Sequence, residues 1–302
     1  MWRPDDRRFV FVTGKGGVGK TTVAAALACA LADRGKNVLV AMCNAKERIS
    51  SMFASAPVGA DLTIVAPRIW AVNICPMRAF EEYGRLLLKA PVLYRPVFRN
   101  KYVRSFLPAV PGLSEWAVLG KAWFHTIETD GRGRNRFDVV LLDAPSTGHG
   151  LDMLRVPKVI MEVVPPGPLR RDAEKAWAMF QDPQQTSVLV VTMPGELPTT
   201  ETIQLVGCVA QELLLPLGAL VVNAVVPPLF TEAEREALTE LDAYDELPAV
   251  LRAAVFRAAE ERLQAQSLAR LTSEIQLERI DLEYLFEEVA TPAAIRKLAR
   301  HF

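Results

Sequence analysis

Two lysines and a threonine stand among closely spaced glycines near the start of the chain. The run is Gly14-Lys15-Gly16-Gly17-Val18-Gly19-Lys20-Thr21-Thr22, and its spacing fits the pattern G-x-x-x-x-G-K-[ST]. Glycines allow a backbone to curl so that successive N–H groups point inward at an anion. A lysine can then reach the outer phosphates of a nucleoside triphosphate, and a threonine hydroxyl can hold Mg²⁺. We therefore expect residues 14–22 to bind phosphate, with Lys20 as the catalytic cation and Thr21 as a metal ligand.

The elements on either side of this loop are those that a phosphate site needs. The apolar run at 9–12 predicts a buried strand leading into the loop, and the alanine-rich stretch at 23–34 predicts a helix leading out. The positive end of that helix dipole would face the bound anion. A glycine-rich turn that binds nothing is the alternative, and the order strand, loop, lysine-threonine and helix argues against it.

A second lysine, Lys15, follows the first glycine, although the phosphate-binding pattern does not require a cation there. At the mouth of the loop its ammonium group would face outward. Lys15 is then either a solubilising charge or a catalytic clamp that reaches a nucleotide held by a neighbouring subunit. We favour the clamp, which predicts a protein that works as a dimer.

A carboxylate, Asp143, ends another very apolar run at 139–142. At the end of a strand beside the phosphate loop, Asp143 would share the metal site and hold Mg²⁺ together with Thr21. Residues 144–150 are small, polar and glycine-rich, as in a loop that changes shape with the terminal phosphate. We assign this second switch to Asp143, Pro145, Thr147, Gly148 and His149, and we assign no proton transfer to the histidine.

The composition is that of a large α/β protein without a strong charge preference. The chain has 302 residues, half of them hydrophobic, and its 35 basic residues balance 35 acidic ones. This length allows one large domain with an insertion, or two domains, and the balanced charge gives no signal for nucleic-acid binding. The four cysteines are far apart in the sequence, which argues against a structural zinc site or a disulfide framework and favours a reducing cytoplasm. The charged N-terminus has no apolar signal-peptide core.

Strand-like runs alternate with helical stretches, which predicts an α/β fold with a doubly wound, mainly parallel sheet. The expected strands lie at 9–13, 37–42, 70–74, 137–142, 187–192, 220–223 and 278–282. The uncharged stretch 213–231 could suggest a membrane span, but its prolines favour a buried parallel strand within 218–224. Ligands of such sheets bind at the carboxyl ends of the strands, where the candidate residues fall.

Two long stretches of helical composition, 77–135 and 151–180, interrupt this alternation. Both are rich in aromatic, leucine and methionine side chains, and residues 78–104 include seven basic and two acidic residues. These stretches either pack as ordinary core or form a helical subdomain with an adaptable groove for an apolar helix of another protein. Basic residues at the rim of that groove would meet acidic flanks or lipid headgroups.

Longer motifs give the chain a family resemblance. Residues 14–22 resemble the deviant phosphate loop of a class of ATPases that includes arsenite-pump ATPases, tail-anchored-protein targeting ATPases, nitrogenase iron protein, and the division-site and plasmid-partition ATPases. Residues 143–149 are similar to the second switch of the arsenite-pump and tail-anchored-protein targeting family. The segments 111–115, 193–202 and 221–223 resemble further motifs of that family, and the likeness covers roughly residues 8–225.

The resemblance implies an ATPase that binds ATP and Mg²⁺ and works as a nucleotide-sandwich dimer. Residues 1–302 would form a single P-loop ATPase domain, with 77–135 and 151–180 as a helical subdomain packed on it. Asn223 would read the adenine edge, and closure on ATP would reshape the groove for a client segment. The family's zinc-binding cysteine pair is absent from this sequence, as in its bacterial members without zinc. We expect a cytoplasmic protein with no nucleic-acid partner and at most peripheral membrane contact.

The sequence departs from the family pattern at the first switch. Where the family has an aspartate that positions the attacking water, this chain has Asn44. An amide can hold a water molecule but carries no negative charge and is not a base. We therefore expect slow hydrolysis as a homodimer, or a role as the catalytically weak half of a heterodimer with a paralogous ATPase.

The last quarter of the chain resembles the family least. Residues 231–262 carry nine acidic and four basic residues and predict solvated amphipathic helices. Residues 282–285 replace a proline-containing adenine lid, and 283–302 predict a closing helix. The tail at 292–302 combines apolar and basic residues, so a membrane- or nucleoid-associated positioning ATPase is a further alternative.

Overall fold

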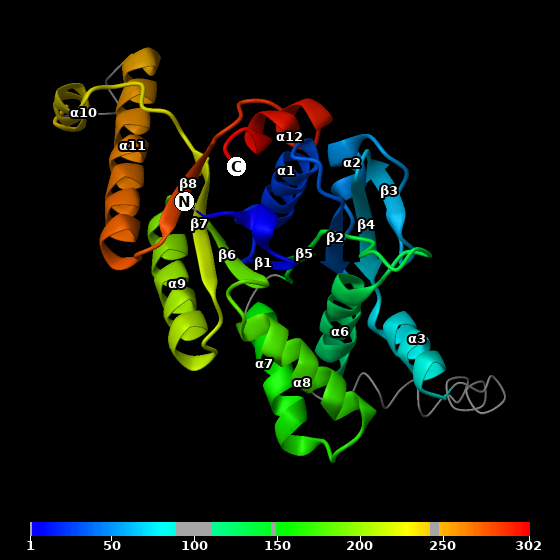
Figure 1. Ribbon diagram of the computed structural model, residues 1–302. Helices are drawn as coiled ribbons and strands as arrows, with labels where there is room; N and C mark the ends of the chain where they lie inside the picture. The colour runs from blue at the N-terminus through cyan, green and yellow to red at the C-terminus, as the bar shows by residue number, and fades with distance from the viewer. Residues whose placement is uncertain (1, 89–109, 111, 146–148, 242–247) are drawn as a thin grey trace.

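An eight-stranded sheet forms the centre of the structure, a computed structural model that describes residues 2–88, 110, 112–145, 149–241 and 248–302 (Figure 1). Its strand order is β3-β4-β2-β5-β1-β6-β7-β8. Only β3, at one edge, runs antiparallel to its neighbour among these eight strands. The predicted doubly wound, mainly parallel sheet is therefore confirmed. The strands are β1 (Phe9–Thr13), β2 (Val38–Cys43), β3 (Thr63–Ala66), β4 (Ile69–Ile74), β5 (Val139–Asp143), β6 (Thr186–Thr192), β7 (Leu217–Val225) and β8 (Glu278–Glu283).

Helices cover both faces of the sheet, as Figure 1 shows. One face carries α1 (Lys20–Asp33), α2 (Ile49–Phe53) and α12 (Pro292–Ala299). The other carries α3 (Pro76–Leu88), α6 (Leu113–Ile127), α7 (His149–Val163), α8 (Pro168–Gln181) and α9 (Glu196–Gly207). Near β8, α10 (Glu232–Thr239) packs on α11 (Ala249–Glu274), which also packs on α9. Two single turns, η1 (Pro4–Asp6) and η3 (Cys208–Glu212), complete the described elements.

Alternate side chains of β1 enter two different cores. Phe9 and Phe11 lie on the face of α8, where their ring centroids are 5.1 and 5.4 Å from the ring of Phe180. Val10 and Val12 lie on the opposite face and pack against α1. A strand that is buried on both faces needs an uninterrupted apolar run, which is what the sequence shows there.

The stretch 213–231 contains β7, which pairs in parallel with β6 and β8, as predicted for a buried strand. Within the described residues, no helix combines the length and apolar character needed to cross a bilayer.

The structure differs from the sequence-based expectations at two elements. The short edge strand β3 was not predicted, because its four residues, Thr63–Ala66, show no alternation of polar and apolar types. The helix expected over 283–302 is wrong in extent, since α12 begins at Pro292, where Thr291 caps the helix by accepting a hydrogen bond from the Ala294 amide at 3.3 Å. Ile295 and Leu298 of this tail are buried with α1, so they offer no apolar surface to a membrane.

Much of the apolar side-chain set that suggested a client groove belongs to the core. The buried members are Trp116 and Trp123 of α6, Met153 and Leu154 of α7, and Met179 of α8. Val159 and Val163 of α7 remain 43% and 71% exposed. Residues 89–109 and 111 of the first helical stretch lie outside the described residues.

A cluster of charged and hydrogen-bonding groups closes the end of α6. Glu128 lies 2.7 Å from Nδ1 of His125 through Oε2, and it accepts a 2.7 Å hydrogen bond from Arg136 through Oε1. The hydrogen bond with His125, followed by that from Arg136, lowers the pKa of Glu128 from 4.5 to about 2. Because the folded pKa lies below the unfolded one, the ionised carboxylate stabilises the fold above pH 4.5, and this contribution is lost as the pH falls toward 2.

We expect Glu128→Gln to lower the free energy of unfolding at pH 7 by about 1–2 kcal/mol, a figure reduced because the carboxylate is partly solvent-exposed. Urea denaturation at pH 7 and pH 3 measures the effect, which should shrink at the lower pH. Glu162→Gln, at an exposed position of α7, is the matched control and should change stability by less than about 0.5 kcal/mol. An equal loss at both pH values would contradict the assignment.

Candidate nucleotide-binding site

The phosphate loop joins β1 to α1 at the carboxyl edge of the sheet. Gly14, Gly17 and Gly19 have φ angles of 149°, 82° and 90°, a region that favours glycine. A Cβ atom on Gly14 would lie 2.1 Å from the carbonyl oxygen of Val191, and one on Gly19 would lie 2.1 Å from Nδ2 of Asn223. The first and last of these glycines are thus required by close packing as well as by backbone conformation.

Lys20 begins α1 and folds back over the loop. Its Nζ donates hydrogen bonds to the carbonyl oxygens of Gly14 and Lys15, at 3.0 and 2.9 Å. The residue is only 6% exposed, and burial lowers the pKa of Lys20 while the nearby Asp143 carboxylate opposes this shift. The ammonium group is therefore held inside the curled backbone, at the position where the sequence pattern predicts a bound phosphate.

Asp143 meets the loop from the neighbouring strand. Val12 of β1 lies opposite Asp143 of β5, and the hydroxyl of Thr21 donates a 2.6 Å hydrogen bond to Oδ2 of Asp143. Burial raises the pKa of Asp143 to about 6, against the opposing effects of Thr21 and Lys20. A carboxylate and a hydroxyl side by side are the oxygen ligands that Mg²⁺ prefers, and a cation would favour the ionised form of this buried acid. The two residues thus fit the predicted metal site.

Asn44 follows β2 at the same edge of the sheet. It is exposed and has a φ of 48°, a left-handed conformation that asparagine tolerates better than most residues. The next residue is held by the side chain of Asn73 on β4, whose Nδ2 donates to the Ala45 carbonyl at 2.8 Å and whose Oδ1 accepts from the Ala45 amide at 3.1 Å. Asn73 therefore fixes the backbone of the residue that follows Asn44, the predicted first-switch residue.

The segment predicted to form the second switch is described only in part. Pro145 is half-buried, His149 opens α7, and Thr147 and Gly148 lie outside the described residues. Asn223, near the end of β7, donates from Nδ2 to the carbonyl oxygen of Val18 at 2.9 Å. In this structure the asparagine supports the phosphate loop, and its contact with adenine stays a prediction.

The strand order brings the predicted groups to one edge of the sheet. The loop after β1 lies between β5, which ends in Asp143, and β6, and β7 with Asn223 follows β6. Asn44 comes two residues after Met42, the partner of Asp143 in the β2–β5 pairing. The structure adds Asn73 and Glu201, the second of which pairs with Lys15 at 2.9 Å. The motif at 193–202 includes residue 201, but no sequence spacing predicts a contact between residues 201 and 15.

Comparisons with known proteins agree with this geometry. Residues 7–165 match the family model described as anion-transporting ATPase. The chain belongs to this family. Its resemblance to the arsenite-pump and tail-anchored-protein targeting ATPases is thereby confirmed at the level of the family.

Several known proteins align with most of the chain. ATPase BagA of Mycobacterium tuberculosis is 30% identical over 225 residues, which cover 73% of this chain and 66% of BagA. An arsenical pump-driving ATPase of Escherichia coli is 28% identical over 268 residues, or 80% of this chain and 44% of the pump ATPase. ATPase GET3B of Arabidopsis thaliana is 26% identical over 272 residues, or 74% and 65% of the two chains. The chain thus spans two thirds or less of the length of these relatives.

We expect Gly19→Ala to weaken Mg·ATP binding at least about tenfold, because the added Cβ meets the Asn223 amide and the left-handed backbone is strained by about 1–2 kcal/mol. Isothermal calorimetry measures the affinity. Gly35→Ala is the matched control, since Gly35 follows α1 with a similar φ of 85° and open space around its Cβ position. Unchanged binding by Gly19→Ala, or an equal loss in Gly35→Ala, would contradict the role of the close approach.

Proposed function

We propose that this chain binds ATP with Mg²⁺, hydrolyses it slowly, and uses bound nucleotide to close two protomers on one another. The observation that carries the proposal is the joint placement of Lys20, Thr21 and Asp143 around a loop curled by glycines. Loop amides and the Lys20 ammonium would bind the phosphates of the nucleotide. Membership in the anion-transporting ATPase family and the names of its relatives support ATP as the substrate.

Thr21 and Asp143 would hold the metal ion in this proposal. Mg²⁺ bound there supplies positive charge that neutralises the phosphate oxygens. Asn223 would orient the nucleoside from the end of β7, where its side chain donates a hydrogen bond to the carbonyl oxygen of Val18. Lys20 would exchange two loop carbonyls for phosphate oxygens, which are stronger acceptors because they are charged.

We attribute slow hydrolysis to Asn44. Its backbone lies at the expected edge, and Asn73 holds the adjoining residue. A carboxamide can orient a water molecule but cannot accept its proton. The same observation supports the second candidate, a weak half-site in a heterodimer with a paralogous ATPase, because a closed pair needs only one efficient site to turn over.

We further propose that nucleotide-driven closure acts on an apolar segment of a client protein. The single domain over 1–302, with 77–135 and 151–180 as its helical part, stays a prediction. Val159 and Val163 are exposed four residues apart on α7, so they share one face of that helix and support an apolar contact surface. The alternative of a membrane-associated ATPase loses support from the burial of Ile295 and Leu298, whereas the nucleoid-associated alternative is not affected by it.

Asn44→Asp should raise the ATP turnover number about tenfold or more, because a carboxylate can both orient and activate the attacking water. Phosphate release under saturating Mg·ATP gives the rate. Asn135→Asp, an identical change at an exposed residue far along the sequence, serves as the control and should leave turnover unchanged. If Asn44→Asp and wild type hydrolyse ATP equally slowly, the first-switch argument is wrong.

Lys15→Ala should retain Mg·ATP binding by the protomer but shift nucleotide-driven association to about tenfold higher protein concentration, because a charge-assisted contact to the partner's nucleotide is lost. Analytical ultracentrifugation with and without Mg·ATP measures association. Lys20→Ala, which removes the cation inside the loop, should instead abolish binding. Association of Lys15→Ala at wild-type concentrations would rule out the clamp across the interface.

A further inference from the structure

Lys15, the outward-facing lysine of the phosphate loop, has an ion-pair partner within its own protomer. Its Nζ lies 2.9 Å from Oε1 of Glu201 on α9. The two side chains are 43% and 25% exposed, so both can also be reached from outside the protomer. The lysine proposed to act across a subunit interface therefore forms an ion pair within its own protomer.

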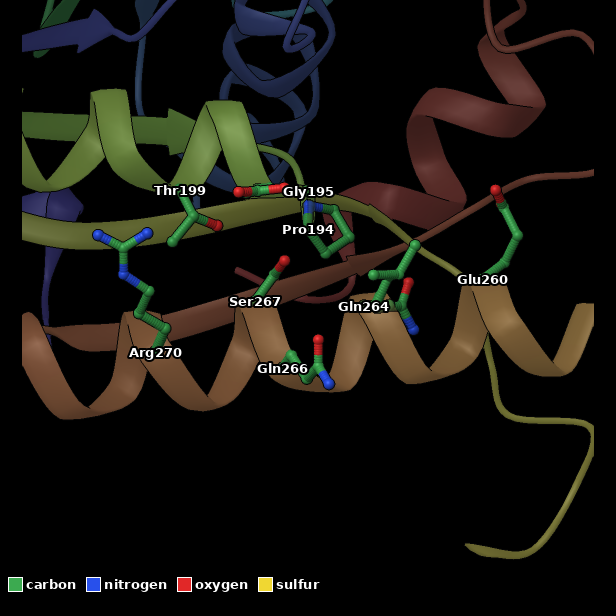
Figure 2. Close-up of a pocket in the computed structure, with 10 residues that line it drawn as sticks. Pro194, Gly195, Thr199, Glu260, Gln264, Gln266, Ser267 and Arg270 are labelled. Carbon is green, nitrogen blue, oxygen red and sulfur yellow. The ribbon is translucent and has the colours of Figure 1, made fainter. Parts of the chain in front are cut away.

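The helix that carries Glu201 is fixed on both sides of this residue. Thr202 donates a 2.9 Å hydrogen bond to the hydroxyl of Thr192 at the end of β6. Arg270 of α11 donates a 2.8 Å hydrogen bond to the hydroxyl of Thr200. Figure 2 shows Arg270 reaching from α11 toward α9 at one end of a pocket of about 410 Å³ between the two helices. The backbone that carries Glu201 is therefore held in place by hydrogen bonds on both sides of this residue.

The lysine side of the pair is the part that can move. Lys20 is buried and bonded to two loop carbonyls, whereas Lys15 is partly exposed and is anchored through the carboxylate of Glu201. A lysine has a long, flexible stem and a compact charge, so it can exchange one anionic partner for another without backbone movement.

We propose that Glu201 is a positioning residue that retains Lys15 on its own protomer and competes for it with the triphosphate bound by a second protomer. The proposal rests on the function proposed above. A triphosphate carries more negative charge than one carboxylate, so Lys15 transfers when a nucleotide-loaded partner approaches. In the absence of that partner, the ion pair with Glu201 holds the Lys15 ammonium group on its own protomer.

An exposed ion pair is weak, and this sets the size of the effect. Competition by Glu201 raises the nucleotide or protein concentration at which protomers associate, but it does not prevent association. Glu201 thus tunes the threshold for closure, while the Lys20 and Asp143 contacts set binding of nucleotide to the single protomer.

The test compares Glu201→Gln, which keeps the shape of the side chain and removes its charge, with Glu196→Gln on the same helix. Glu196 is exposed and gives the same change of net charge. In a first arm, mild acylation followed by mass spectrometry measures how fast the Lys15 amine reacts in nucleotide-free protein. Glu201→Gln should raise this rate about two- to fivefold, the range expected from loss of an exposed ion pair. Glu196→Gln should match wild type.

In a second arm, ultracentrifugation over a Mg·ATP series measures association of the variants. Glu201→Gln should lower the half-saturating nucleotide concentration about two- to fivefold, with protomer affinity for Mg·ATP unchanged at low protein concentration. The effect should vanish in a Lys15→Ala background, which a purely structural role of Glu201 would not predict.

The outcomes separate the two levels of the argument. If wild type associates with Mg·ATP but Glu201→Gln associates at the same or a higher concentration, the competition is refuted and the proposed function stands. An effect that persists in the Lys15→Ala background also refutes it. If wild type neither binds Mg·ATP nor associates, the proposed function falls and the inference falls with it. Glu201→Asp keeps the charge on a shorter side chain. It tests whether a change in association depends on the ion pair with Lys15 and does not arise from altered folding.

Discussion

The carboxylate of Asp143 is buried at the carboxyl edge of the sheet. The hydrogen-bond donor and the cation that stabilise this charge determine how the rest of the site is arranged. Thr21 donates a hydrogen bond to it, and Lys20 supplies a nearby positive charge. Both come from the first turn of α1, so the loop between β1 and α1 must curl tightly enough to bring them back to β5. The parallel pairing of β1 with β5 makes this possible, because it sets Val12 opposite Asp143. Burying a carboxylate is costly unless a donor or cation accompanies it, and the raised pKa of Asp143 expresses that cost.

Three polar side chains expected to meet a nucleotide have partners within the protomer. Lys20 is bonded to loop carbonyls, Lys15 is paired with Glu201, and Asn223 is bonded to Val18. A ligand must therefore replace these contacts, so its affinity reflects the difference between two sets of hydrogen bonds. Charged phosphate oxygens are better acceptors than backbone carbonyls, which favours the exchange inside the loop. At Lys15 the competing partner is itself an anion, the Glu201 carboxylate, so the free-energy difference between the two partners is smaller.

Sequence alone predicted the sheet, the loop and the acid beside it, because these depend on local patterns: apolar runs for buried strands, glycines for the curl, and a carboxylate at a strand end. It could not predict Asn73 or Glu201 as partners of the site, since each contact joins segments brought together only by the strand order. Asn223 was assigned to adenine by resemblance, and the structure shows it bonded to the loop backbone. The closing helix was predicted to begin too early, since Pro292 and the Thr291 cap set its true start. The tail's apolar face was ambiguous until the position of α1 was known.

The order of strands in space differs from their order along the chain, and this has a consequence for biosynthesis. The loop at 14–19 leaves the ribosome before β6 and β7, yet Gly14 lies against Val191 and Gly19 against Asn223. β1 also waits for β6, whose first paired residue is Thr186. A nascent chain that has not reached Asn223 cannot yet support the loop, because distant pairings form only after the intervening segments close. The loop therefore gains its full support only when β7 joins the sheet and brings Asn223 against Gly19.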